Sequence, residues 1–137
     1  MSVSKEDFIR LADLHLRDAL ILLKNDRFSG AYYLGGYSLE CALKAVICDH
    51  FQHQVIPDKA LVNAIYVHDL NKLVSLAGLK VELDQKLKDE EFASMWALAS
   101  NWHEGARYEF STNFDAHALL NCINNKGGIL EWIKSHW

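Results

Sequence analysis

Apolar side chains along this chain recur mainly at the three- and four-residue spacings of α-helices. In residues 4–24 they form one face, and Ser4 precedes that face as a candidate N-cap. The face consists of Phe8, Leu11, Ala12, His15, Ala19 and Leu22. We expect His15 to be a core histidine whose hydrogen-bonding groups are satisfied. No segment keeps up the two-residue alternation of a half-buried strand, so the pattern predicts an all-α fold.

The next apolar segment, residues 28–48, is apolar on nearly every side yet contains Glu40 and Lys44, four residues apart. Such a pattern predicts a buried central helix. The two charges could form an ion pair along one helix face, or they could point together into a polar groove between helices. Gly35 and Gly36 lie in the middle of this helix, where small residues allow a neighbouring element to approach closely. The segment is long enough to span a bilayer, but its charges argue against that.

Short helices are expected in the middle of the chain. Residues 52–67 are ambiguous, and residues 62–67 could be either a short helix or an irregular packed segment. Asp69 can cap a helix over residues 70–77, which Gly78 would end in the usual C-terminal way.

A longer helix is expected to begin near Asp84. Its apolar face would consist of Leu87, Met95, Ala99 and Trp102. The helical pattern breaks at Gly105, and either Ser111 or Asn113 can cap the helix that follows. Residues 129–137 are expected to form a last short helix.

The bulk composition limits the functional classes. The 137 residues are the usual size of one domain, so we expect a single helical domain over residues 1–137. A net charge of -4 gives no basic footprint for duplex DNA. Cys41, Cys48 and Cys122 match no zinc-binding spacing and are interpreted as reduced thiols of a cytoplasmic protein. The first residues contain no apolar stretch typical of a signal peptide.

No sequence motif indicates a cofactor or a metal ion. The chain contains no glycine-rich phosphate loop, H-E-x-x-H or G-x-S-x-G. Asp49, His50 and His53 are residue types that can bind a metal. The two histidines, however, stand three residues apart at a predicted helix end without a third ligand nearby. A solvated helix terminus is therefore expected there, with no metal and no cofactor.

Two further groups of polar residues could contribute chemistry. His68 and Asp69 lie at a predicted helix start. In one interpretation Asp69 caps the helix and His68 is a packed loop residue. In the other, His68 faces a cleft as an acid/base or as a contact to a phosphate. His103, Arg107 and Tyr108 follow the long predicted helix on a glycine-containing loop, and binding groups concentrate on loops. Arg107 could grip a phosphate, or it could pair with a nearby acid such as Glu104, Glu109 or Glu40.

The run from Ala31 to Lys44, Ala-Tyr-Tyr-Leu-Gly-Gly-Tyr-Ser-Leu-Glu-Cys-Ala-Leu-Lys, resembles the second-helix signature of HEPN domains. His68-Asp69-Leu70 and the Trp102…Arg107-Tyr108 element fall where many bacterial members have similar groups. The resemblance covers about residues 5 to 125, and its Leu-Glu-Cys-Ala-Leu-Lys motif is the most specific part.

This resemblance implies an antiparallel helical bundle of four to five helices, with short extra helices, often assembled as a homodimer. It also implies a role linked to a nucleotide or RNA, commonly in toxin–antitoxin or defence systems. Many members pair with a small nucleotidyltransferase-like partner, which acts as the antitoxin. On this resemblance Glu40, Lys44, His68, Asp69, Arg107 and Tyr108 are the candidate ligand-binding residues.

The nuclease motif of the family, R-x(4–6)-H on a late helix, is not matched. The first histidine after Arg107 is His117, which is too far away. Arg10 and His15 have the spacing but lie on the first predicted helix, about 140° apart around its axis, so we interpret them as a chance match.

Three functions remain open from the sequence. The first is a non-catalytic HEPN-like module that binds a nucleotide, RNA or a protein partner. The second is a metal-independent endoribonuclease toxin with a displaced site, in which His103 or His68 would be the acid/base and Arg107 would stabilise the phosphate charge. The third is a structural dimer or scaffold in which the polar groups satisfy one another.

Overall fold

The computed structural model describes residues 3–51 and 53–137, which form helices and no strand. In chain order the elements are α1 (Lys5–Lys24), α2 (Phe28–Ile47), η1 (Cys48–His50), α3 (Lys59–Ala64), α4 (Leu70–Leu76), α5 (Lys80–Lys86), α6 (Glu90–Ala99), η2 (Glu104–Tyr108), α7 (Asn113–Asn124) and α8 (Ile129–Lys134), where η marks a 3-10 helix. The predicted all-α class is therefore confirmed, as a bundle of packed helices.

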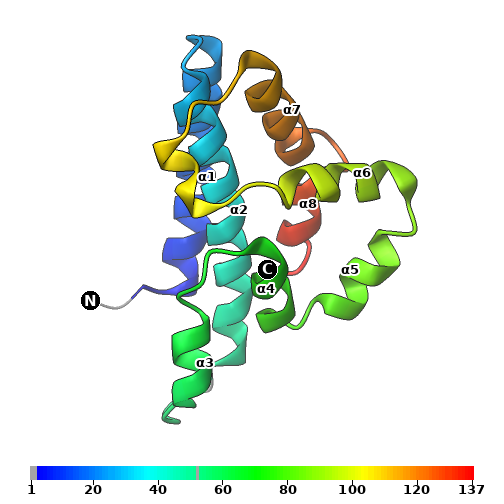
Figure 1. Cartoon of the computed structure of the whole chain (residues 1–137). Coiled ribbons are helices and arrows are strands. Elements are labelled where there is room, and N and C mark those ends of the chain that lie inside the picture. The colour runs from blue at the N-terminus through cyan, green and yellow to red at the C-terminus, as the bar shows by residue number, and fades with distance from the viewer. Residues whose placement is uncertain (1–2, 52) are drawn as a thin grey trace.

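Helix α2 lies at the centre of this bundle. It runs antiparallel to α1 as the second arm of a long hairpin (Figure 1). It also contacts α4, α7, α8 and η2, so other elements cover the sides that α1 leaves open. Buried side chains from α1, α2 and α4 to α8 join in one hydrophobic core. The prediction that residues 28–48 form a buried central helix is confirmed.

Two predicted caps are present. The side chain of Ser4 accepts a hydrogen bond from the backbone N–H of Asp7, and the carboxylate of Asp7 accepts one from the backbone N–H of Ser4, which completes a capping box. The carboxylate of Asp69 accepts from the N–H of Lys72 at 2.9 Å and starts α4. Gly78 follows α4 with a φ of +73°, in the left-handed region that favours glycine.

Three helix boundaries differ from the expectation. The prediction of one long helix from Asp84 is wrong, because α5 and α6 divide this region. The side chain of Asp89 accepts hydrogen bonds from the N–H groups of Glu91 and Phe92 and caps the start of α6. In the ambiguous segment 52–67, the helix is α3, which begins before residues 62–67 and ends at Ala64. Residue 52 lies outside the described part of the chain. Helix α7 is capped by Thr112, not by Ser111 or Asn113.

The glycine pair of α2 confirms the expected close approach. A Cβ built on Gly35 would stand 3.0 Å from Leu120 of α7. A Cβ built on Gly36 would lie within the indole ring of Trp102, which is 3% exposed in the segment between α6 and η2. Only a residue without a side chain lets the indole lie against the backbone of α2.

The expectation of a fully satisfied His15 is wrong. Its ring is half-buried against Tyr37, with ring centroids 4.9 Å apart, and its buried Nδ1 has no hydrogen-bond partner within the described residues. Burial lowers the pKa of His15, and the nearby carboxylate of Asp18 only partly opposes that effect. A hydrophobic face can therefore contain a histidine without a partner, provided that the ring stays neutral.

The lowered pKa of His15 predicts a loss of stability in mild acid. In the unfolded chain the pKa is the ordinary one, so below about pH 6.5 the unfolded chain binds more protons than the folded one. The free energy of unfolding should then fall as the pH drops from this value towards the lower pKa of the folded state. His15→Phe keeps a ring against Tyr37 but cannot titrate, so we expect a smaller fall in urea unfolding measured between pH 7 and pH 5. An equal pH dependence in the two proteins would contradict this origin.

None of the helices in residues 3–51 and 53–137 combines the length and the hydropathy needed to cross a bilayer. In α2, the side chains of Glu40 and Lys44 interact with each other inside the protein.

Candidate functional site

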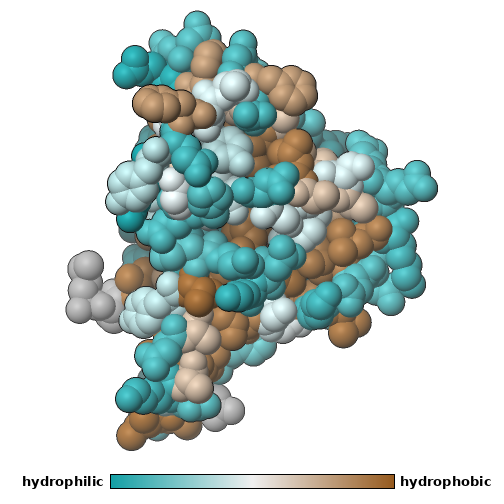
Figure 2. Space-filling model, in the orientation of Figure 1, coloured by the Kyte–Doolittle hydropathy of each residue, from teal (hydrophilic) through white to brown (hydrophobic). Residues whose placement is uncertain are grey.

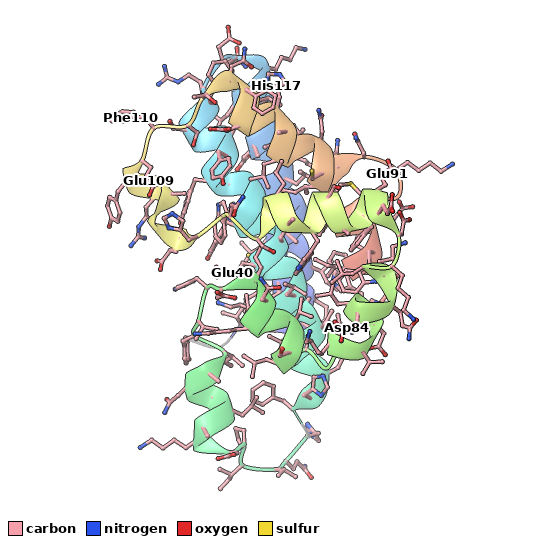
Figure 3. The ribbon with its side chains drawn as sticks, turned by 45° about the vertical axis from the view of Figure 1, so that its right-hand side comes forward. Glu40, Asp84, Glu91, Glu109, Phe110 and His117 are labelled. Atoms are coloured by element: carbon pink, nitrogen blue, oxygen red, sulfur yellow. The ribbon has the colours of Figure 1, made fainter. Side chains whose placement is uncertain are left out.

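The carboxylate of Glu40 is the buried centre of a chain of charged side chains. It comes from the middle of α2, and its side chain is 1% exposed (Figure 3). Lys44, one turn further along α2, donates a hydrogen bond from Nζ to Glu40 Oε2 at 3.0 Å. His68, just before α4, places Nδ1 at 3.0 and 3.1 Å from the two carboxylate oxygens. A residue from one helix thus fixes the ring of a residue 28 positions away.

The same histidine connects the buried carboxylate to the surface. His68 Nε2 lies 3.1 Å from Glu104 Oε2 of η2. The other oxygen of Glu104 lies 3.3 Å from Nη2 of Arg107, also in η2. Lys44, Glu40, His68, Glu104 and Arg107 therefore form one continuous set of close polar contacts, which we call the polar network. It joins α2, the start of α4 and η2.

The ring of His68 lies between two carboxylates. Its Nδ1 is within hydrogen-bonding distance of both oxygens of Glu40, and its Nε2 faces an oxygen of Glu104. A carboxylate can only accept a hydrogen bond, so each of these contacts uses a proton on the ring nitrogen. Both ring nitrogens are therefore turned towards acidic side chains of the protein itself.

Two other polar side chains beside the polar network are held neutral. Burial raises the pKa of the Cys41 thiol to about 12, with the negative charge of Glu40 adding to the effect. Burial likewise raises the pKa of the Tyr37 phenol to about 12, and Cys41, Glu40, Tyr33 and Glu104 add to it. A thiol or phenol attacks as its anion, so neither group is a nucleophile near neutral pH.

The outer end of the polar network is open to solvent. The side chain of Arg107 is 46% exposed, and Tyr108 is 77% exposed. The guanidinium carbon of Arg107 stands 4.9 Å from the centroid of the Tyr108 ring, a cation–π contact. Tyr108 and Glu104 raise the pKa of Arg107 further, so the guanidinium remains charged. The site therefore offers a fixed positive charge beside an exposed aromatic ring.

The polar network brings together most of the candidate residues, but not all of them. Glu40, Lys44, His68 and Arg107 belong to it, with Tyr108 against its outer end. The carboxylate of Asp69, by contrast, caps α4. His103 also lies apart, because its Nε2 faces Glu109 at 3.2 Å and both side chains are 58% exposed.

Glu104 is the component that the sequence did not single out as a site residue. The sequence offers it only as one of several possible partners of Arg107, and in the structure it bridges Arg107 to His68. Its spacing of three residues from Arg107 was the available signal, since that spacing places two side chains together on one helical turn. Arg107 reaches Glu40 only through Glu104 and His68, not directly.

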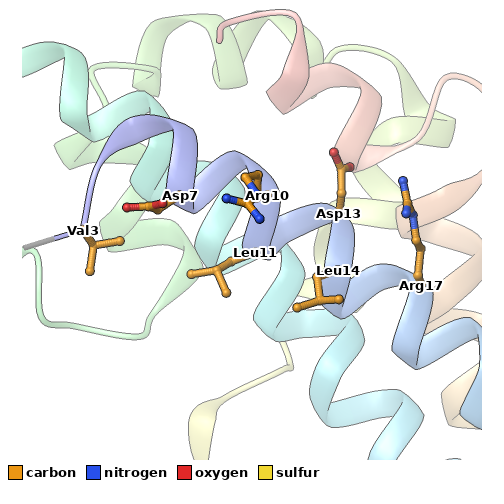
Figure 4. Close-up of a pocket in the computed structure, with 7 residues that line it drawn as sticks. All are labelled: Val3, Asp7, Arg10, Leu11, Asp13, Leu14 and Arg17. Carbon is orange, nitrogen blue, oxygen red and sulfur yellow. The ribbon is translucent and has the colours of Figure 1, made fainter.

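The alternative arginine–histidine pair of α1 does not form a site. Arg10 lines a shallow hollow of about 650 Å³ on the exposed face of α1, together with residues such as Asp7, Leu14 and Arg17 (Figure 4). His15 instead packs against Tyr37 of α2. The two side chains thus lie in different surroundings.

Of the three residues suited to a metal, Asp49 and His50 are engaged with protein groups, and His53 is exposed. His50 Nε2 hydrogen bonds with the carbonyl oxygen of Ala77 at 2.8 Å, which orders an end of the helix that was expected to be solvated. The carboxylate of Asp49 accepts two hydrogen bonds from Lys5 Nζ, at 2.9 and 3.0 Å. Within the described residues, no group of three or more histidine, cysteine or acidic side chains is arranged to hold a metal ion.

Comparisons with known proteins found no matching protein family, no matching curated protein and no matching solved structure. The function of the site therefore has to be argued from its own geometry.

Proposed function

We propose that this chain is a non-catalytic HEPN-like module that binds one nucleotide unit, free or within single-stranded RNA, at Arg107 and Tyr108. The observation that supports this most is the exposed Arg107–Tyr108 pair, which Glu104 and His68 connect to the buried carboxylate of Glu40. In this proposal Tyr108 stacks on the base. Glu104 takes only one edge of the guanidinium, so further N–H donors of Arg107 reach the phosphate.

The number of available groups favours a single nucleotide over a long strand. One exposed ring provides one stacking surface, and one guanidinium provides one phosphate contact. Glu104 and Glu109 lie in the same segment and would repel a longer polyanion. In this proposal Glu40, Lys44 and His68 orient the site and do not touch the ligand.

The non-catalytic part of the proposal rests on the state of the polar side chains. Both nitrogens of His68 face carboxylates, and Nε2 of His103 faces Glu109. Burial raises the pKa of Cys41 and of Tyr37 to about 12. A displaced ribonuclease site would need a histidine free to exchange a proton with the attacking hydroxyl. The context implied by the family resemblance is a toxin–antitoxin or defence system, with a homodimer or a nucleotidyltransferase-like antitoxin as partner.

Arg107→Ala is expected to weaken binding of a short fluorescein-labelled oligoribonucleotide by about tenfold, because a hydrogen bond to a charged group contributes about 1.5–3 kcal/mol. Tyr108→Ala should have a similar effect. Both side chains are largely exposed, so the melting temperature should stay close to that of the wild type. Fluorescence polarisation measures the affinity.

His103→Ala is the matched control, since it lies in the same segment but pairs only with Glu109. It should bind the oligoribonucleotide as the wild type does. Wild-type affinity in Arg107→Ala would contradict the proposed site. Cleavage of the oligonucleotide by the wild type, lost in His103→Ala, would favour the ribonuclease instead.

A further inference from the structure

Two phenylalanines stand out from the end of the molecule where the α1–α2 turn meets the start of α7. Phe110 is 100% exposed and Phe114 is 78% exposed, although both side chains are large and apolar. Figure 2 shows hydrophobic side chains rising from a hydrophilic surround at this end, and Figure 3 shows Phe110 pointing away from the helices beside Glu109. We call Phe110 and Phe114 the aromatic surface.

The segment that presents the aromatic surface is fixed by hydrogen bonds. The backbone N–H of Ser111 donates to Ser29 Oγ of α2 at 2.9 Å, which joins this segment to the start of the central helix. Thr112 accepts from the N–H of Asp115 at 3.1 Å and caps α7 between the two phenylalanines. The two rings are therefore presented on ordered backbone, which lowers the entropy that binding would cost.

A hollow lies beside each ring. The first, about 540 Å³, is bordered by Phe110 and has Leu22 and Phe28 in its wall. The second, about 280 Å³, is bordered by Phe114 and has Tyr32 and Leu98 in its wall. Projecting aromatic rings next to hollows with both apolar and polar walls are typical of protein–protein interfaces, where aromatic anchors dominate.

The charges around the aromatic surface indicate what would cover it. Asp26 lines the first hollow, Asp115 lines the second, and Glu109 precedes Phe110. The one basic side chain in these two walls is Arg27, in the first. A polyanion such as RNA would be repelled by this acidic rim, and so would the identical rim of a second copy of the chain.

We propose that the aromatic surface docks a partner protein that offers apolar side chains flanked by basic ones. The partner's apolar groups enter the two hollows and cover the rings, and its lysine or arginine side chains meet Asp26, Glu109 and Asp115. This surface is separate from the nucleotide contacts at Arg107 and Tyr108, so one chain can hold a nucleotide and a protein at adjoining places.

Two labelled amphipathic helical peptides test this, with the same leucine positions and either lysine or glutamate at every polar position. Measured by fluorescence polarisation against the full chain, the lysine peptide should bind at least about tenfold more tightly, a difference of about 1.4 kcal/mol. The double variant Phe110→Ser/Phe114→Ser should lose that binding by a similar factor. Asp26→Asn/Asp115→Asn should reduce the preference for the lysine peptide.

Ile56→Ser is the matched control, because Ile56 is 94% exposed but precedes α3, away from this surface. It should bind the lysine peptide as the wild type does, and so should Arg107→Ala, which tests the nucleotide site alone. Wild-type affinity in the Phe110/Phe114 variant, or no preference between the peptides, would overturn the proposal. If the wild type self-associates and Phe110→Ser/Phe114→Ser does not, the occupant is a second copy of the chain and the proposal is overturned. If that variant loses oligoribonucleotide binding while Arg107→Ala keeps it, the occupant is RNA, which also overturns the proposal.

Discussion

Gly36→Ala is expected to lower the free energy of unfolding by about 2–3 kcal/mol, because overpacking a filled core costs more than the roughly 1 kcal/mol that alanine gains in a helix. The new methyl group would lie within the indole of Trp102, which is 3% exposed. The indole cannot turn aside as a long aliphatic chain can. Either α2 or the segment between α6 and η2 has to move.

Urea unfolding followed by circular dichroism measures this effect, and the melting temperature should fall by roughly 8 °C for a chain of this size. Gly30→Ala in the same helix is the control, since its Cβ would meet only the flexible end of Leu22, at 3.1 Å. Its stability should be unchanged or raised by up to ~1 kcal/mol. Equal stabilities of the two variants would show that the indole does not need the glycine.

Glu40→Leu is expected to destabilise the fold by about 3 kcal/mol, because removing one partner of a buried ion pair leaves the other charge without compensation. The side chain of Lys44 is only 14% exposed, and its ammonium has Glu40 as its partner. His68 would lose its contact with α2 as well, and Glu104 and Arg107 would lose their link to the core. Chemical denaturation measures the loss.

Glu40→Leu/Lys44→Met should recover most of that loss, since replacing a whole buried ion pair by apolar side chains of similar size is often neutral. Asp84→Asn breaks an ion pair of the same i,i+4 type and the same 3.0 Å length, but one whose side chains are 65% and 56% exposed. We expect it to cost at most about 0.5 kcal/mol. If all three variants were equally stable, burial would not be what makes Glu40 important.

Much of the fold could be predicted from spacing alone. The apolar face of α1, its Ser4 cap and the buried character of α2 each depend on residues near one another in the sequence. The division between α5 and α6 was missed, because Asp89 had to be recognised as a cap within a run that otherwise continues the helical pattern. A single side chain bonding to two backbone N–H groups was enough to override that pattern.

The candidate site was predicted as a list of residues but not as an arrangement. The motif at Glu40 and Lys44 contains two of the five residues of the polar network, and the i,i+4 spacing implies their ion pair. That His68 turns one nitrogen towards Glu40 and the other towards Glu104 could not be derived, because the three residues come from α2, the start of α4 and η2. Asp69 and His103 lie outside the polar network because Asp69 caps α4 and His103 faces Glu109, and the sequence did not predict the second of these contacts.

By itself the sequence determined the helical class, the central position of α2 and the presence of two charges within it, since helix periodicity and burial act over a few residues. Only the tertiary structure decided that those charges are part of a network reaching the surface at Arg107, and that Phe110 and Phe114 stay outside the core. The physical reason is that a charge or a ring takes its role from what surrounds it, and those surroundings come from elements far apart in the chain.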